Sequence, residues 1–408
     1  MIRLTKKIFT KIYTFFHNLF IVILGFFYGR SKKCILIGAW GGTKFADNSR
    51  FLYQYLFQNK ESLGLKRVIW VTREKKVNDL LLEMGYESYL IGTKKSRYWH
   101  LKCGVHIICN MMSKTSSFLP DIDVKYSAGA KRVQLWHGVG IKACKYMVSN
   151  AKEKKGLKLF YSKYLSYYFS PGFWENHYFL ATSEENKRVT IADHGINPKK
   201  IIIAGYPRLT PCLKYTKDEK NIIDKIVSLK EKNKIVLFLP TFRESIKEYT
   251  FPQNIDGFDK FLEQNNIIWI QKSHSADVNG NISKHNNRII ALDSKFDINV
   301  LYDYIDLVIT DYSSASSDAI YKNVLTLEYC PDYENYRNND RGFVGDFDKY
   351  HIFEPVVKKE NLFERIIWVL NQDLKSIKKH EEVKKFIFES QNSSMDEIFN
   401  IIRKKIKI

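Results

Sequence analysis

The sequence lacks the short signatures that would place it at once in a metal-binding, disulfide-rich or dinucleotide-binding class. Its six cysteines form no C-x-x-C pair and follow no framework spacing, so we expect reduced, mostly buried thiols in a cytosolic compartment. No G-x-G-x-x-G motif occurs, which argues against a dinucleotide site of the usual Rossmann type. We also find no internal repeat and no low-complexity tract. The 408 residues, of which 45% are hydrophobic, are enough for two domains with a core each.

Acidic residues are scarce relative to basic ones, with 44 Asp and Glu against 65 Lys and Arg and a formal net charge of +21. Such a balance implies anionic partners, which are nucleic acid, phospholipid or a phosphate-rich substrate. The lysines are spread along the chain, and no zinc-finger spacing, RNA-binding aromatic signature or homeodomain pattern accompanies them. We therefore predict no nucleic-acid partner and favour an anionic membrane surface and a phosphate-rich substrate.

Residues 1–33 lack an apolar run of the length that a membrane span needs. The apolar stretch Leu19–Tyr28, interrupted only by Gly25, is short for a hydrocarbon core of roughly 30 Å. The polar and basic residues of this segment are a stripe at helical spacing followed by a closing cluster: Lys7, Lys11, Thr14, Asn18, then Arg30, Lys32 and Lys33. We predict a basic amphipathic helix that lies in the membrane interface. A single span and a buried structural helix are the alternatives, and a signal peptide fits only in outline because no small-residue cleavage site follows.

Apolar strands alternate with helices through the rest of the chain. In the first half we expect strands at Cys34–Ala39, Val68–Thr72, Ser88–Ile91, Val105–Cys109, Val133–Trp136, Tyr178–Ala181 and Ile201–Ala204. In the second half we expect them at Ile235–Leu239, Ile267–Gln271, Ile289–Leu292, Leu307–Thr310 and Val324–Glu328. This alternation predicts α/β architecture with parallel, doubly wound sheets. Because it restarts after the charged helix Asp218–Lys232, we predict a membrane-associating segment (1–33), a first domain (34–205), a second domain (206–355) and C-terminal helices (356–408).

One stretch of the second half combines an apolar strand, a turn of hydroxyl residues and a helix start, at Leu307–Thr310, Asp311–Ser314 and Ala315–Asn323. First-turn amides together with Ser313 and Ser314 as helix caps would form a seat for an anion. In the loop beyond, either Arg337 or Arg341 could clamp a phosphate in bidentate fashion. The alternative is an ordinary capped helix, but the nearby arginines favour a diphosphate site.

Four further blocks precede this stretch in order: QLWHG at Gln134–Gly138, GYPR at Gly205–Arg208, LPTFRES at Leu239–Ser245 and KSH at Lys272–His274. Together with the DYSS…RGF stretch, they resemble the CDP-glycerol glycerophosphotransferase family of teichoic-acid primases and polymerases, over about residues 34 to 345. The resemblance implies a GT-B-like fold with two Rossmann-like domains facing a cleft, the first on the acceptor side and the second binding the CDP-polyol donor.

His137 directly follows the apolar strand Val133–Trp136, in a loop with two glycines. Ligands gather at the carboxyl ends of strands in open α/β sheets, and a histidine with a pKa near ~6.5 can accept a proton from a hydroxyl at neutral pH. The residues alone leave open a loop histidine bonded to backbone. The resemblance implies a catalytic role, although Val139–Gly140 stands where the family has Thr-Pro.

The remaining candidate residues also follow apolar strands. His274 matches the second family histidine, with Ser275 in place of the usual proline, and the resemblance implies a contact with the donor diphosphate. Lys272 either assists it or is solvated. Hydroxyl and guanidinium groups at Thr241 and Arg243 suit phosphate, and the alternative there is a plain helix cap with a surface arginine. Asp311 matches an acidic family position and either orients a histidine, contacts the donor or caps the next turn.

No metal site is predicted, although Asp346–Phe347–Asp348 has the form of a D-x-D motif. The resemblance implies no cofactor and leaves a divalent-metal requirement open. It implies an enzyme on the cytoplasmic face of the membrane that transfers glycerol phosphate, or a related polyol phosphate, from CDP-glycerol or CDP-ribitol to a lipid-linked acceptor in teichoic-acid or capsular polymer synthesis. The alternatives are a GT-B glycosyltransferase that uses a nucleotide sugar and a non-enzymatic basic protein that recruits polyanions.

Overall fold

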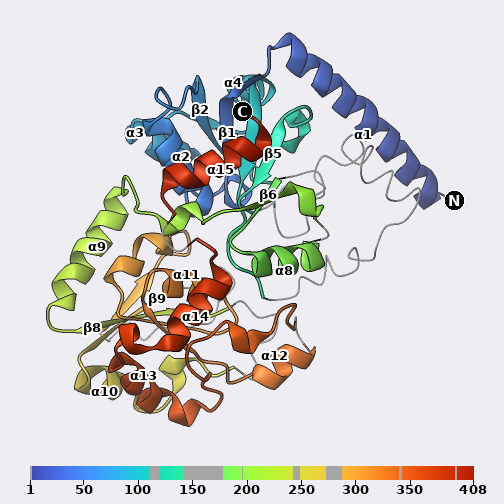
Figure 1. The fold of residues 1–408 in the computed structure, drawn as a ribbon. Helices are drawn as coiled ribbons and strands as arrows, with labels where there is room; N and C mark the ends of the chain where they lie inside the picture. The colour runs from blue at the N-terminus through green and yellow to red at the C-terminus, as the bar shows by residue number, and fades with distance from the viewer. Residues whose placement is uncertain are drawn as a thin grey trace. The chain divides into compact units, whose positions relative to one another are not determined.

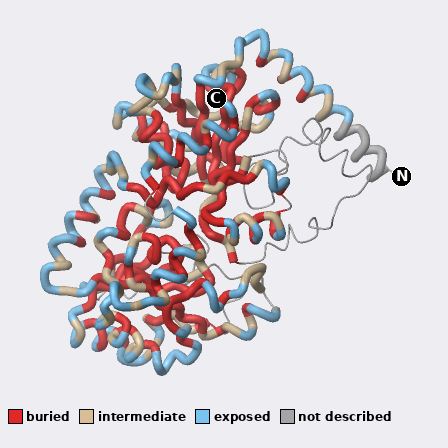
Figure 2. Tube along the Cα trace, viewed as in Figure 1, coloured by how far each residue is buried: buried red, intermediate tan, exposed pale blue. Residues whose placement is uncertain are grey.

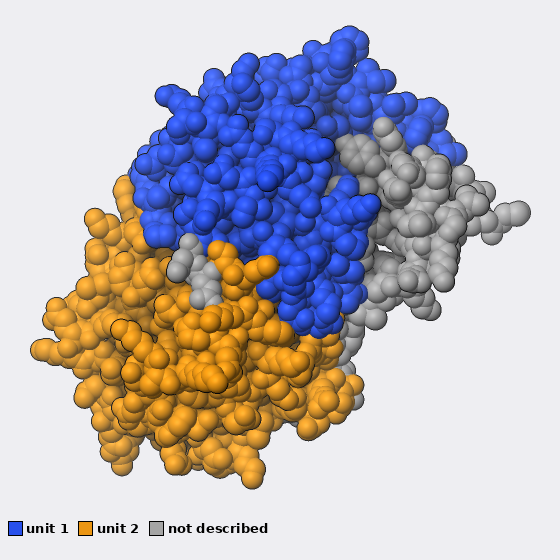
Figure 3. Space-filling view, in the orientation of Figure 1, with its two compact units in different colours: residues 1–137, 146–214, 392–408 blue, residues 138–145, 215–391 orange. Residues whose placement is uncertain are grey.

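The computed structural model describes residues 2–110, 119–141, 178–194, 196–241, 249–272, 287–339, 342–390 and 393–408. The chain forms two compact units, which Figure 3 distinguishes by colour. Unit 1 comprises Met1–His137, Tyr146–Lys214 and Asn392–Ile408, and unit 2 comprises Gly138–Lys145 and Tyr215–Gln391. The chain thus leaves unit 1 after Lys214, whereas we predicted a domain limit after residue 205, and its last segment belongs to unit 1.

Unit 1 is built on a seven-stranded parallel sheet (Figure 1). Its strands are β1 Ser31–Ile37, β2 Arg67–Thr72, β3 Ser88–Leu90, β4 Cys103–Ile108, β5 Lys131–Gln134, β6 Tyr178–Ala181 and β7 Ile201–Ile203. They lie in the order β3-β2-β1-β4-β5-β6-β7. The chain runs outward from β1 to β3 and then places β4 on the other side of β1. The sheet therefore has a topological switch point between β1 and β4, where open α/β sheets bind their ligands.

The described helices of unit 1 are α1 Ile2–Phe27, α2 Asp47–Gln58, α3 Lys75–Glu83, α4 Lys94–Lys102, α8 Glu184–His194 and α15 Met395–Ile406, with short 3-10 helices η1 Trp40–Gly42, η2 Val124–Tyr126, η5 Pro198–Lys200 and η6 Pro207–Leu209. Helix α15 comes from the end of the sequence and packs on β7 and α2. There the hydroxyl of Tyr55 donates a hydrogen bond to the carboxylate of Asp396. The predicted C-terminal helices are therefore divided between the two units.

Unit 2 is built on a five-stranded parallel sheet in the order β10-β9-β8-β11-β12. Its strands are β8 Lys234–Leu239, β9 Ile267–Lys272, β10 Ile289–Leu292, β11 Leu307–Thr310 and β12 Leu325–Glu328. Its helices are α9 Lys217–Lys230, α10 Phe258–Gln264, α11 Ala315–Tyr321, α12 Tyr333–Asn339, α13 Leu362–Leu370 and α14 Lys378–Ile387, with η7 Pro252–Asn254, η8 Ile298–Val300, η9 Tyr302–Tyr304, η10 Phe347–Lys349, η11 Lys359–Asn361 and η12 Leu374–Ser376. This sheet repeats the winding of the first and has its switch point between β8 and β11.

The central strands of both sheets are buried along most of their length (Figure 2). All residues of β4 and of β11 are buried, and Trp70 and Trp269 are among the largest side chains that are wholly enclosed. Parallel sheets covered on both faces require such near-continuous apolar runs. This is why the strand predictions are confirmed: every expected strand occurs, with small shifts at its ends.

Helix α1 packs on unit 1 partly through its polar stripe. Asn18, predicted on the polar stripe, is 1% exposed, and Ile21 joins a buried cluster with Leu101 and Ala128. The exposed side of the helix carries large apolar residues instead: Ile12, Tyr13, Phe16, Leu19, Phe20, Ile23, Phe26 and Phe27. Within the described residues, no helix has both the length and the apolar character of a membrane span.

Arg30 fixes the end of α1 to the body of unit 1. Its Nη1 donates to the carbonyl oxygens of His100 (3.1 Å) and Cys103 (2.7 Å). Its Nη2 donates to those of Tyr126 (3.2 Å) and Ala128 (3.0 Å). Arg30, which we placed in the basic cluster that closes this segment, thus uses its guanidinium for contacts within the protein.

Helix starts differ from the predictions more than strands do. From the sequence we expected Asp47 or Asn48 to cap a helix, but α2 begins at Asp47 and its N-cap is Ala46. Helix α11 is only seven residues long, and its N-cap Ser314 makes no side-chain cap hydrogen bond. Arg337, which we expected in a loop, lies in α12.

Candidate active site

A buried aspartate closes the switch point of unit 1. The Asp121 carboxylate accepts hydrogen bonds from the backbone N–H groups of Gly41 (2.8 Å), Cys109 (3.1 Å) and Asn110 (2.7 Å). Gly41 follows β1 and the other two follow β4, so one carboxylate joins the strands on either side of the switch point. In dinucleotide-binding sheets, backbone amides at this place hold a phosphate. In unit 1 the protein's own carboxylate takes these three amides.

The chain must approach itself closely at this point, and glycine makes that possible. A Cβ atom on Gly38, directly after β1, would lie 2.3 Å from the carbonyl oxygen of Asp121. Any larger residue would push the segment carrying Asp121 away from the sheet. The end of β1 and the position of the aspartate are therefore coupled.

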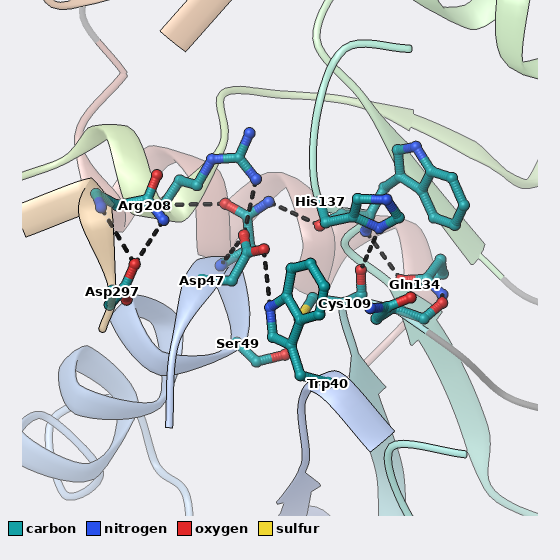
Figure 4. A network of polar contacts seen from close by, with 12 residues as sticks. Trp40, Asp47, Ser49, Cys109, Gln134, His137, Arg208 and Asp297 are labelled. Atoms are coloured by element: carbon teal, nitrogen blue, oxygen red, sulfur yellow. Dashed lines mark hydrogen bonds and ion pairs between the residues drawn. The ribbon is translucent and has the colours of Figure 1, made fainter. Parts of the chain in front are cut away.

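His137 lies half-buried at the same carboxyl edge, after β5 (Figure 4). Its ring centroid is 5.6 Å from that of Trp40 and 4.2 Å from that of Trp136. Its Nδ1 is 3.4 Å from the carbonyl oxygen of Cys109. A hydrogen on Nδ1 that donates to this carbonyl leaves the lone pair on Nε2, the nitrogen that can then accept a proton.

A second histidine lies behind this one. The ring of His194 is 4.7 Å from that of Trp136. Burial, with a smaller contribution from His137, lowers the pKa of His194 to about 3. His194 is therefore neutral at physiological pH and adds no positive charge that would oppose protonation of His137.

A buried ion pair supports Trp40 from the other side (Figure 4). Asp47 Oδ1 accepts a hydrogen bond from Arg208 Nη1 at 2.7 Å, and Asp47 Oδ2 accepts one from Trp40 Nε1 at 3.2 Å. Both members of the ion pair are almost wholly buried. A buried pair of this kind contributes little net stability but fixes geometry. Its effect here is to hold the indole of Trp40 beside His137.

The switch point of unit 2 is also bridged by an aspartate. Asp311, directly after β11, accepts the backbone N–H of Thr241, directly beyond β8, with both carboxylate oxygens at 3.0 Å. Its Oδ1 also accepts the N–H of Tyr312 at 2.7 Å. The structure therefore brings together two residues that we predicted as donor contacts, Thr241 and Asp311. Of the roles considered for Asp311, the one seen in these contacts is that of capping the turn.

The two serines after this turn differ in how their hydroxyls are used. Ser313 Oγ accepts the backbone N–H of Ala315 at 3.3 Å, whereas the Ser314 hydroxyl makes no cap bond. Both residues are half-buried. The prediction of two serine caps is therefore wrong for Ser314. Arg337 is exposed on α12.

Tyr312 fixes the turn from below. Its hydroxyl donates to Asp332 Oδ1 at 2.9 Å, and its ring stacks on Tyr336 with 3.9 Å between centroids. Burial raises the pKa of Tyr312 well above its usual value, with Cys330 and Asp332 adding to the effect. The phenol therefore stays protonated and acts as a permanent donor. The turn that presents Ser313 and Ser314 is thus held rigidly against the core.

Three candidate residues lie outside the described residues: Arg243, His274 and Arg341. Lys272, at the end of β9, is half-buried and donates to the carbonyl oxygen of Phe296 at 2.6 Å. In the D-x-D segment, Asp346 caps η10 by accepting the N–H of Asp348 at 3.3 Å. Among the described residues, no group of three or more His, Cys, Asp or Glu side chains is arranged to hold a metal ion.

Sequence reasoning missed the residues that organise the first switch point. Asp121 bonds residues far from it in the chain, and nothing in its local pattern marks it. We considered Asp47 and Asn48 only as helix caps. A signal was present in the Trp-Gly-Gly turn at Trp40 directly after a buried strand, since such turns allow close backbone approach.

The chain matches a protein family over most of its length. The sequence model of the family described as CDP-Glycerol:Poly(glycerophosphate) glycerophosphotransferase matches residues 23–403. A teichoic acid poly(glycerol phosphate) polymerase of Bacillus spizizenii is 25% identical over 335 residues, which are 78% of this chain and 79% of that protein. A teichoic acid glycerol-phosphate transferase of Staphylococcus aureus is 24% identical over 344 residues, which are 81% of this chain and 82% of that protein.

Solved structures share the fold. The wall teichoic acid polymerase TagF aligns with a TM-score of 0.66 at 17% identity, covering 100% of this chain and 98% of that one. A structure described as a putative UDP-N-acetylglucosamine 2-epimerase from Listeria monocytogenes aligns with a TM-score of 0.54 at 13% identity, covering 92% of this chain and 96% of that one. At these identities the likeness concerns the α/β fold with its parallel sheets.

Proposed function

Because the chain belongs to the CDP-glycerol:poly(glycerophosphate) glycerophosphotransferase family, we propose that it transfers glycerol phosphate, or a related polyol phosphate, from a CDP-polyol to a hydroxyl of a lipid-linked acceptor. The acceptor oxygen forms a bond to the phosphorus nearest the polyol. The bond from that phosphorus to the bridging oxygen of the diphosphate breaks, and CMP leaves with the electron pair. The acceptor proton passes to a base on the enzyme. Positioning and charge stabilisation supply most of the catalysis in such reactions.

His137 is the base in this proposal, and its geometry is the observation that carries it. It stands at the carboxyl edge of the first sheet, flanked by Trp40 and Trp136 and with its Nδ1 toward the carbonyl of Cys109. We assign Nε2 as the atom that takes the proton from the acceptor hydroxyl. His194, whose pKa burial lowers to about 3, is neutral behind His137.

We assign the acceptor to unit 1 and the CDP-polyol donor to unit 2, as in the GT-B arrangement. The three amides at the first switch point are occupied by Asp121, which suits a site for a hydroxyl-bearing acceptor more than one for a diphosphate. The second switch point is followed by half-buried serine hydroxyls, and Ser314 is not used as a cap. Such hydroxyls can donate to phosphate oxygens.

Donor binding in this proposal uses groups from several segments of unit 2. Thr241, Ser313 and Ser314 supply neutral donors, and Asp311 holds the turn that presents them. Arg243, Arg337, Arg341 and His274 supply positive charge to the diphosphate and the leaving CMP. No resident cofactor is needed for these steps. Reactions with magnesium and with a chelator test whether they depend on a divalent cation.

We further propose that the enzyme is a peripheral protein of the cytoplasmic membrane face, with α1 in the interface. Its outward side carries large apolar residues, among them Phe16, Phe20 and Phe26, which are 63%, 56% and 81% exposed. A net charge of +21 adds attraction to anionic lipid. The four hydrogen bonds of Arg30 would attach the membrane-bound helix to the body of unit 1.

The activity is tested by incubating the full chain with CDP-glycerol, CDP-ribitol or UDP-sugars and a synthetic lipid-linked acceptor. We expect CMP release with a CDP-polyol and a product whose mass increases by one or more polyol phosphate units. Parallel reactions with magnesium and with a chelator decide the metal requirement. UDP release alone would establish the glycosyltransferase alternative, and binding of polyanions without any turnover would establish a non-enzymatic role.

The membrane proposal is tested by sedimentation with vesicles of anionic phospholipid. Replacing Phe16 and Phe20 by glutamate should move the protein from the vesicle pellet to the supernatant, because burial of apolar area as well as charge holds an interfacial helix. Leu82→Glu is the matched control, since Leu82 is 53% exposed on the distinct helix α3. Equal pelleting of the double variant and the control would contradict a role for α1.

A further inference from the structure

Trp136, the residue before the candidate base, has a backbone conformation that residues other than glycine rarely adopt. Its φ is +60°, in the left-handed region. Trp40 (φ +48°) and Asp47 (φ +65°) share this feature at the same edge of the sheet. Strained conformations of this kind persist only where the surrounding structure determines them, and they gather at functional sites.

Two buried side-chain amides hold the backbone on both sides of Trp136. The N–H of Trp136 donates to Gln134 Oε1 at 2.9 Å, and its carbonyl oxygen accepts from Asn48 Nδ2 at 2.8 Å. Gln134 and Asn48 are both wholly buried. The backbone N–H and C=O of one residue are therefore each tied to an amide from a different element, the end of β5 and the first turn of α2.

Each amide is itself fixed at its other end. Gln134 Nε2 donates to the carbonyl oxygen of Asn110 at 2.9 Å, beyond β4. Asn48 Oδ1 accepts the backbone N–H of Arg208 at 3.1 Å. Both side chains thus use a donor and an acceptor at once, which fixes the orientation of each amide. Fully satisfied polar groups in a buried setting specify one geometry.

We propose that Asn48 and Gln134 are positioning residues for transfer, because they hold Trp136 in the left-handed conformation that presents the imidazole of His137. The proposal rests on the proposed function in that His137 is the base. Neither amide contacts the imidazole in this assignment. They act through the peptide groups of Trp136, whose φ sets the direction in which the next residue leaves the strand.

Loss of either amide would allow Trp136 to relax to an ordinary backbone conformation and would move His137. A displacement of about 1 Å at a reacting group can cost around 10²-fold in rate. Donor binding would be spared, since none of these residues belongs to unit 2. The expected signature is thus a lower kcat with an unchanged KM for the donor.

The experiment compares Asn48→Ala and Gln134→Ala with Asn59→Ala in the full chain. Asn59 is the matched control because its amide also donates to a backbone carbonyl, that of Tyr55 at 2.9 Å, at the other end of α2. Steady-state kinetics with CDP-glycerol and a lipid acceptor give kcat and KM. Histidine labelled with ¹³C at Cε1 gives the NMR signal and titration of His137, assigned by its absence in His137→Gln.

We expect kcat to fall by about 10- to 100-fold in each variant, with the donor KM within a factor of two. We also expect a shifted His137 signal and pKa, whereas Asn59→Ala should match the wild type in all of these. An unchanged His137 signal in either folded variant would overturn the proposal, as would loss of folding in both variants, because a positioning role does not decide the fold.

The NMR readout needs no turnover, so it separates this inference from the proposed function. If the wild type releases no CMP from CDP-glycerol, the proposed function fails, while a shift of the His137 signal in the variants still establishes that the amides set its position. If the wild type is active and the signal does not move, the inference alone fails.

Discussion

In both sheets an aspartate joins the ends of the two strands at the switch point, but the residues beyond the aspartate differ between the two units. In unit 1, Asp121 joins the ends of β1 and β4, and in unit 2, Asp311 joins the ends of β8 and β11. Beyond Asp121 the edge is aromatic and carries His137. Beyond Asp311 the edge carries the serine hydroxyls of the turn that precedes the short helix α11. The same bridge thus supports a site with a base in one unit and a site with hydrogen-bond donors in the other.

Two sheets of the same winding can thus carry two different roles. An aspartate that occupies the amides of a switch point removes the usual phosphate site there. Binding of an anion must then depend on side chains, such as those of arginine and serine. Proton transfer instead needs a residue of suitable pKa held in one orientation, and the rigid turn after β5 provides that.

We expect the largest effect from removal of the candidate base in unit 1. His137→Ala should lower kcat by about 10²–10⁴-fold, the usual range for general acid–base catalysis. Affinity for CDP-glycerol, measured by calorimetry, should stay within a factor of two because the lost interaction belongs to the transition state. His274→Ala should weaken donor binding as well as turnover if that histidine contacts the diphosphate.

His17→Ala is the matched control, because Nε2 of His17 also lies near a backbone carbonyl, that of Lys125 at 3.1 Å. It should leave turnover on a water-soluble acceptor unchanged. Normal turnover of the His137 variant would end the proposed mechanism. A loss of donor affinity as large as that of the His274 variant would mean that His137 contacts the donor and that its assignment to the acceptor is wrong.

A buried carboxyl group distinguishes the edge of unit 2 in a second way. Glu328 is almost wholly buried at the end of β12, and neither of its oxygens accepts a hydrogen bond of normal geometry from the described residues. Burial raises its pKa to about 8, against a smaller opposing effect of the nearby Ser316. The group is thus largely protonated in the folded state at neutral pH.

The sign of the resulting pH dependence follows from the raised pKa. The folded protein keeps a proton that the unfolded chain releases above its normal carboxyl pKa, so stability falls as the pH rises from about 5 to about 8. Glu328→Gln should be close to wild type at pH 5 and more stable by roughly 3–5 kcal/mol at pH 9. Urea unfolding at both pH values tests this, and parallel stability curves for the two proteins would contradict it.

The strands and the position of His137 at the carboxyl edge could be predicted from the sequence because both depend on local pattern. An apolar β-rich run predicts a strand wherever helices cover both faces, and a polar residue directly after such a run falls at the carboxyl edge. The bridging role of Asp121 could not be predicted, since its partner Gly41 is 80 positions away in the chain. Contacts of that separation are fixed by topology, which local pattern does not supply.

The side of α1 that packs on the protein could not be predicted, and the caps of α2 and α11 were predicted wrongly, for a related reason. Helical periodicity gives two faces but not which one meets the protein, and the tertiary contacts of Ile21 and Arg30 decide it. Propensity places serine at a cap, but in the turn after β11 the hydroxyl of Ser314 is not used in this way. Tertiary structure overrides both local preferences.

A smaller effect separates the two bridging aspartates from each other. Asp121 uses both oxygens for different amides, with Gly41 on Oδ1 and Cys109 and Asn110 on Oδ2. Asp311 can satisfy both of its amides through Oδ1 alone. An asparagine keeps one acceptor oxygen, so Asp121→Asn must lose a bridge that Asp311→Asn can retain.

We therefore expect Asp121→Asn to lower the free energy of unfolding by about 3 kcal/mol and Asp311→Asn by about 1 kcal/mol. Hydrogen exchange read by mass spectrometry assigns each loss to its unit, since the units need not unfold together. Equal losses in the two variants would show that the bridges are equivalent and that the contrast drawn from their geometry is wrong.

The smallest effect concerns a single hydroxyl at the edge of unit 2. Within the described part of the chain the Ser314 hydroxyl makes no cap bond, and we expect it to bind a ligand, whereas the Ser376 hydroxyl donates to the carbonyl of Asp373 at 2.7 Å within its own turn. Ser314→Ala should weaken binding of CDP-glycerol by about 5- to 10-fold, the value of one neutral hydrogen bond of roughly 1 kcal/mol. Ser376→Ala should leave it unchanged, and Arg341→Ala should weaken it more than Ser314→Ala, since a charge-assisted bond is roughly twice as strong. Calorimetry with CDP-glycerol and with CMP alone places the contact, because a hydroxyl that binds the phosphate nearest the glycerol affects only the first ligand. Wild-type affinity in both the Ser314 and the Arg341 variants would mean that the donor does not bind at the end of β11. The two switch points would then not have the separate roles that we propose.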